Sequence, residues 1–76
     1  MINLFRRKKV TFLDNYWSVI KADVRVSNVP NVGELIYNTE EGKYFEVIKV
    51  IYNLTNNKCQ DIFVIIETYA GELKNN

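Results

Sequence analysis

Apolar and polar residues alternate along much of the chain, and turn residues divide the alternating stretches. Residues 16–27, YWSVIKADVRVS, place Ile20, Val24 and Val26 on one face, with polar side chains between them. A period of two with β-branched residues predicts a strand. The apolar residues of 13–20 also fit helical spacing, so a helix over that range remains the alternative.

Three turns punctuate the rest of the chain. Residues 29–33, VPNVG, end the first strand, because Pro cannot donate a ladder hydrogen bond and Gly allows positive φ. Residues 39–42, TEEG, predict a three-residue hairpin loop with Gly42 left-handed, and Asn56-Asn57 predicts a second tight turn. The strands predicted between these turns cover residues 34–38, 43–54 and 60–69, and residues 10–13 are a possible fifth short strand.

These elements predict a mainly β protein, a four- to five-stranded antiparallel meander that curves into a small barrel. The 76 residues are enough for one domain. We expect a basic N-terminal arm over residues 1–9, a single β domain over 10–70, and a frayed tail over 71–76.

Turn chemistry sets the expected register. If Thr39 pairs with Lys43, and Thr55 with Lys58, one face of the sheet is almost entirely apolar and becomes the core. Its one charge is Lys49, whose stem can extend toward solvent. The predicted core face holds Leu35, Tyr37, Phe45, Val47, Ile51, Ile62, Val64 and Ile66, with Ile20, Ala22, Val24 and Val26 closing over it.

The second face is also apolar, mixed with acids, and apolar patches of this kind mark contacts. In the expected register Glu46 faces Glu67, and like charges directly opposite each other destabilise a strand pair. Either the register shifts by one residue, or a positive group lies over the pair. The predicted protein interface is Glu46, Ile48, Val50, Tyr52, Phe63, Ile65 and Glu67.

The charge is uneven along the chain. Arg6, Arg7, Lys8 and Lys9 are four consecutive bases, whereas the rest of the chain has six bases and nine acids. Such an arm, with Leu4, Phe5, Phe12 and Leu13 beside the bases, could cover the second face in its own chain or in a second copy.

The amino-acid composition excludes several kinds of catalytic and metal site. The chain has no His and one Cys, which removes the usual zinc sites and the Cys–His and Ser–His nucleophilic pairs. Cys59 is expected to be a small buried hydrophobe. Glu46 and Glu67 could act as a carboxylate pair, but no phosphate loop, nucleophile or metal ligand set accompanies them. We therefore expect no enzyme activity, no metal and no cofactor.

The basic run also supports an alternative, a nucleic-acid-binding barrel in which Arg6, Arg7, Lys8 and Lys9 contact phosphates and Trp17 stacks on a base. Leu4 and Phe5 beside these bases could instead rest on anionic lipid. No run of about 20 apolar residues could span a bilayer, and the N-terminus lacks the order of a signal peptide. The expected location is the cytoplasm.

The stretch Val32-Gly33-Glu34-Leu35, followed by YFEVIKVIY and DIFVIIE, resembles the strand–turn pattern of small SH3-like barrels over residues 24–69. It is also similar to short proteins of phages and bacterial mobile elements. The resemblance implies a small barrel and leaves function open, because such barrels bind RNA, peptides and proteins. We expect a non-catalytic interaction protein that self-associates, with nucleic-acid binding as the alternative.

Overall fold

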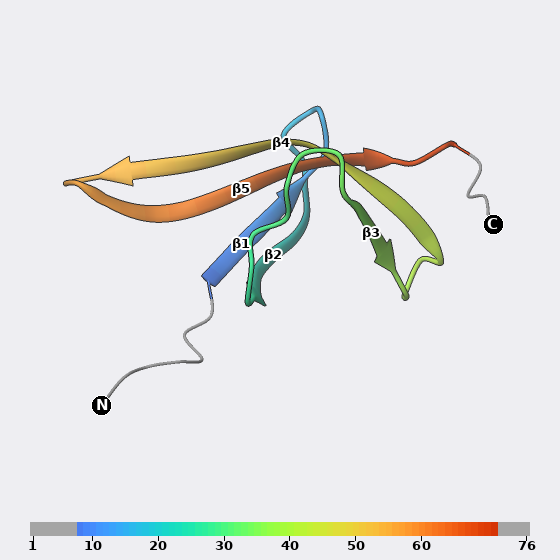
Figure 1. Cartoon of the computed structure of the whole chain (residues 1–76), viewed down its shortest axis with the longest axis horizontal. Helices are drawn as coiled ribbons and strands as arrows, with labels where there is room; N and C mark the ends of the chain where they lie inside the picture. Colours follow the sequence, from blue (N-terminus) through green and yellow to red (C-terminus); the bar gives the residue numbers. More distant parts are fainter. Residues whose placement is uncertain (1–7, 72–76) are drawn as a thin grey trace.

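The computed structural model describes residues 8–71, and for residues 59–60 only the backbone. Five strands form one sheet, and no helix occurs in the described part of the chain (Figure 1). The mainly β prediction is confirmed, and a helix over 13–20 is wrong. The strands are β1 (Lys8–Leu13), β2 (Val19–Val26), β3 (Leu35–Asn38), β4 (Lys43–Thr55) and β5 (Lys58–Thr68).

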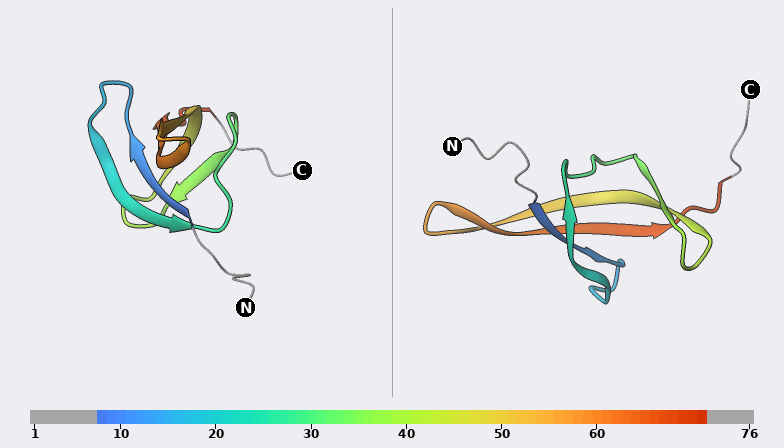
Figure 2. Two further views of the ribbon diagram at one scale, coloured as in Figure 1. Left: turned by 90° about the vertical axis from the view of Figure 1, so that its left-hand side faces the viewer. Right: turned by 90° about the horizontal axis from the view of Figure 1, so that it is seen from below.

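The strand order is β2-β1-β5-β4-β3, so the sheet is mixed rather than a purely antiparallel meander. β1 pairs antiparallel with β2 and parallel with β5, and the last strand thus lies in the middle of the sheet. The sheet curls into a half-barrel with β2 and β3 as its two edges, as the end-on view shows (Figure 2). β1 begins at Lys8, so two bases of the predicted arm belong to the sheet.

Two bulges explain where the β4–β5 register differs from expectation. Thr55 pairs with Lys58 and Val47 with Ile66, as predicted. Gln60 is an extra residue on β5 and Ile48 an extra residue on β4, and between them the pairing is shifted by one. Each bulge reverses the alternation of side chains, and the two shifts cancel. Lys49 thereby leaves the predicted core face and is exposed.

The β3–β4 loop is one residue longer than predicted, because Asn38 pairs with Lys43 and the loop is 39–42. Asn38 Oδ1 accepts hydrogen bonds from the backbone N–H groups of Glu40 and Glu41, at 3.0 and 3.3 Å. Gly42 has φ 67°, as expected for its left-handed position. The shift turns Ile36 toward the core and leaves Leu35 and Tyr37 exposed, so the predicted core places for Leu35 and Tyr37 are wrong.

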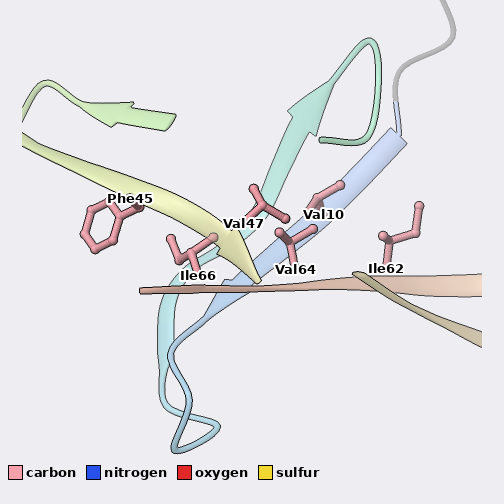
Figure 3. Close-up of a cluster of buried hydrophobic side chains, with 6 residues drawn as sticks. All are labelled: Val10, Phe45, Val47, Ile62, Val64 and Ile66. Carbon is pink, nitrogen blue, oxygen red and sulfur yellow. The ribbon is translucent and has the colours of Figure 1, made fainter. Parts of the chain in front are cut away.

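The core lies on the inner, concave face of the half-barrel, where Val10, Val47 and Val64 are fully buried at 0% exposure. Ile20 and Val26 of β2 pack against this cluster as predicted, whereas Ala22 is exposed and Ile51 points to the other face. Figure 3 shows the six clustered side chains, which are Val10, Phe45, Val47, Ile62, Val64 and Ile66.

Candidate interaction surface

A second group of apolar side chains lies on the outer face of the three middle strands. Leu13 is level with Ile65, Ile51 pairs with Phe63, and Ile48 with Lys49 opposes Ile65 at the bulge. Leu13 and Ile65 are buried yet lie outside the core cluster. The outer patch consists of Leu13, Ile48, Ile51, Phe63 and Ile65.

The outer patch has no second layer over it within residues 8–71. The described chain is a single sheet that curls toward its concave side, so no other sheet or helix packs on the outer face (Figure 2). Phe63, Ile51 and Ile48 remain half-buried and present part of their surface to solvent. An apolar surface across three neighbouring strands is the type of surface that a partner covers.

Charged pairs border the outer patch on two sides. Glu46 faces Glu67 across β4 and β5, as the turn chemistry predicts, and Asn15 Nδ2 donates a 2.7 Å hydrogen bond to Glu67 Oε2. Lys9 faces Arg25 across β1 and β2. Of the two alternatives expected for this pair, the register shift does not occur at Glu46 and Glu67, and the group bonded to Glu67 is the neutral Asn15 amide rather than a cation.

The structure places most of the predicted interface residues together on the outer face, and it places two of them on the opposite, concave side. Glu46, Phe63, Ile65 and Glu67, with Ile48 at the bulge, lie on the outer face. Val50 and Tyr52 are corrected to the concave side: Val50 pairs with the fully buried Val64 and packs against the core, and Tyr52 pairs with the buried Ile62.

Sequence reasoning missed two members of the outer patch. Ile51 was assigned to the core because the Ile48 bulge carries no clear sequence signal. Leu13 was expected in a possible fifth strand or beside the bases of the arm, and only the parallel pairing of β1 with β5 places it next to Ile65 on the outer face. That pairing also corrects the arm hypothesis: Phe12 packs against the core, and Leu13 belongs to the surface that it was expected to cover.

Of the candidate nucleic-acid residues, the three within residues 8–71 do not form one surface. Lys8 points to the concave side, Lys9 to the outer face, and both are exposed. Trp17, 64% exposed with φ 66°, lies in the β1–β2 turn beyond the far end of β1. A six-residue strand spans about 20 Å, so Trp17 and the two lysines are well apart. Arg6 and Arg7, like Leu4 and Phe5, lie outside the described residues.

A groove of about 300 Å³ opens on the concave side between the edges β2 and β3. Phe12, Ile36 and Phe45 contribute to its apolar lining. An ion pair between Lys21 Nζ and Glu40 Oε1 joins β2 to the β3–β4 loop beside it. The hydrogen bond and charge of Lys21 lower the pKa of Glu40 below its ordinary value.

Within residues 8–71, no helix is long and apolar enough to cross a membrane, and no three acidic or sulfur side chains gather as ligands for a metal ion. The side chain of Cys59 is not among those described. Comparisons with protein-family models, curated proteins and solved structures found no match.

Proposed function

We propose that this protein is a non-catalytic interaction module that acts through its outer patch, and that its first partner is a second copy of itself. One observation carries the proposal: Ile48, Ile51 and Phe63 are half-buried on the outer face of the middle strands, and no second layer covers that face within residues 8–71. Apolar surface removed from water gives roughly 25 cal/mol per Å², which favours a covered patch.

The size of the chain supports self-association. A 76-residue chain whose sheet curls to one side has a small core, and small domains often gain stability from a second subunit. Strongly curved single sheets also leave the outer side of their middle strands accessible, whereas a two-layer fold would bury it.

Sedimentation velocity over a range of protein concentrations tests the proposal, with Phe63→Asp as the disrupting variant. We expect the wild type to dimerise and Phe63→Asp to remain monomeric, because the new carboxylate would lose its hydration at the contact. Leu54→Asp is the matched control, since Leu54 is 70% exposed near the end of the β4–β5 hairpin, outside the outer patch.

A wild type that stays monomeric at high concentration would contradict the proposal, as would equal dissociation by Phe63→Asp and Leu54→Asp. Circular dichroism of both variants confirms that each keeps the sheet. Added polyanion separates this function from nucleic-acid binding: a nucleic-acid-binding protein should bind single-stranded DNA at low salt and release it as salt rises, whereas this function predicts no such binding.

A further inference from the structure

Two cross-strand pairs of like charge, opposite in sign, lie on the outer face. Lys9 and Arg25 form the basic pair, and Glu46 and Glu67 form the acidic pair. Each pair is unfavourable within its own chain, because like charges directly opposite each other repel. None of the four takes part in an ion pair within residues 8–71.

The side on which these residues lie follows from the buried residues next to them. Lys9 precedes Val10, and Glu46 precedes Val47, and both valines are fully buried on the concave side. Alternation along a strand therefore places Lys9 and Glu46 on the outer face, together with the residues that they pair with.

The two pairs flank the outer patch from opposite ends. Val10 is level with Ile62 of the parallel strand β5, so Lys9 is level with Asp61. Asp61 precedes Glu67 by six residues along β5. That separation is about 20 Å along the strand. Phe63 and Ile65 of the outer patch lie midway between the basic pair and the acidic pair.

We propose that two copies meet face to face about a two-fold axis that crosses β5 between Phe63 and Ile65, so that the basic pair of each copy contacts the acidic pair of the other. This arrangement rests on the proposed function and specifies its geometry. A two-fold contact is self-complementary, so a residue at one end of the patch meets the residue at the other end.

This symmetry satisfies both charge pairs at once. Each basic pair meets an acidic pair, and the contact forms twice in one dimer. At the centre of the contact, the half-buried Phe63 of each copy packs against the outer patch of the other, beside Lys49, which faces the buried Ile65. Asp61 lies on the basic side, where its carboxylate accepts a 3.4 Å hydrogen bond from Asn53 Nδ2, so two bases outnumber one acid there.

Charge reversal tests the arrangement. The first variant combines Lys9→Glu with Arg25→Glu, and the second combines Glu46→Lys with Glu67→Lys. In the homodimer of either variant, the reversed pair of one copy would meet a pair of the same charge in the other copy. We therefore expect the dissociation constant of each homodimer to rise about tenfold or more. Mixed in equal amounts, the two variants would pair opposite charges at every contact, and we expect a heterodimer of wild-type affinity.

A control separates the contact from net charge. Lys43→Glu with Lys58→Glu changes the net charge by the same amount as the first variant, at exposed positions beside the β3–β4 and β4–β5 turns, outside the outer patch. It should leave the dimer within about twofold of wild type. Both reversals keep like charges within each cross-strand pair, so each monomer should fold, which circular dichroism checks.

The outcomes distinguish this arrangement from the proposed function. Weakened homodimers and a restored heterodimer support the two-fold axis. In a second outcome, Phe63→Asp dissociates the wild-type dimer, but the two reversed variants form no heterodimer when they are mixed. This result overturns the two-fold axis and leaves the outer patch as the contact. A wild type without self-association overturns both.

Discussion

Glu46 and Glu67 face each other directly across the two longest strands of the sheet. Asn15 donates to Glu67 from the β1–β2 turn, whereas Glu46 makes no ion pair within residues 8–71. The pair therefore opposes the stability of its own chain. Beside an uncovered apolar patch, the same two charges are available to a partner.

Replacing Glu46 by Gln should stabilise the isolated chain. The change removes one of the two facing charges and keeps the side-chain size, so we expect a gain of about 0.2–1 kcal/mol in the free energy of unfolding. Urea denaturation at concentrations where the chain is monomeric measures the gain. A loss of stability in Glu46→Gln would mean that the acidic pair is already compensated within the chain.

Aspartate at Val50 should act differently from aspartate at Phe63. Val50 packs against the core on the concave side, so its carboxylate would be buried without a partner, and we expect a loss of more than about 2 kcal/mol in folding stability. Phe63→Asp should lose less folding stability than Val50→Asp, because Phe63 lies on the outer face. Thermal unfolding of the two monomers compares them, and equal losses would contradict the assignment of their faces.

Trp17 occupies a left-handed backbone conformation that side chains with a Cβ adopt at a cost. Trp17→Gly and Trp17→Ala remove the same indole ring, but only Gly relieves the backbone. We expect the Gly variant to be more stable than the Ala variant by about 1 kcal/mol, measured by chemical denaturation. An Ala variant of equal or greater stability would show that the turn does not hold Trp17 at positive φ in solution.

The Lys21–Glu40 ion pair gives stability a small dependence on pH. Because the folded state lowers the pKa of Glu40, its contribution is present above the ordinary carboxyl pKa and is lost as the pH falls through the lowered value. The melting temperature of the wild type should therefore be slightly higher than that of Glu40→Gln near neutral pH. This difference in melting temperature should vanish in acid. A difference that grows on acidification would contradict this sign.

The strands and tight turns could be predicted from the sequence, since period-two patterns and residues such as Gly42 and Asn56 act locally. The pairings of Val47 with Ile66 and of Glu46 with Glu67 were also correct. The faces of residues 49–52 could not be predicted, because two bulges reverse the alternation between them. Bulges arise from packing across strands, which a local pattern does not contain.

The parallel pairing of β1 with β5 was equally beyond the sequence pattern. It joins residues about fifty positions apart, such as Val10 with Ile62, and no turn between them fixes the register. The sequence therefore indicated an apolar and acidic second face and most of its residues, but placed Val50 and Tyr52 there instead of Leu13 and Ile51.

The most direct test of the central claim is a concentration series of amide spectra of the ¹⁵N-labelled protein. If the outer patch is the contact, the amide signals of Leu13, Phe63 and Ile65 will shift as concentration rises, and those of Gly42 and Asn57 in the hairpin loops will not. Spectra independent of concentration, or shifts confined to the concave groove around Ile20 and Ile36, would contradict it.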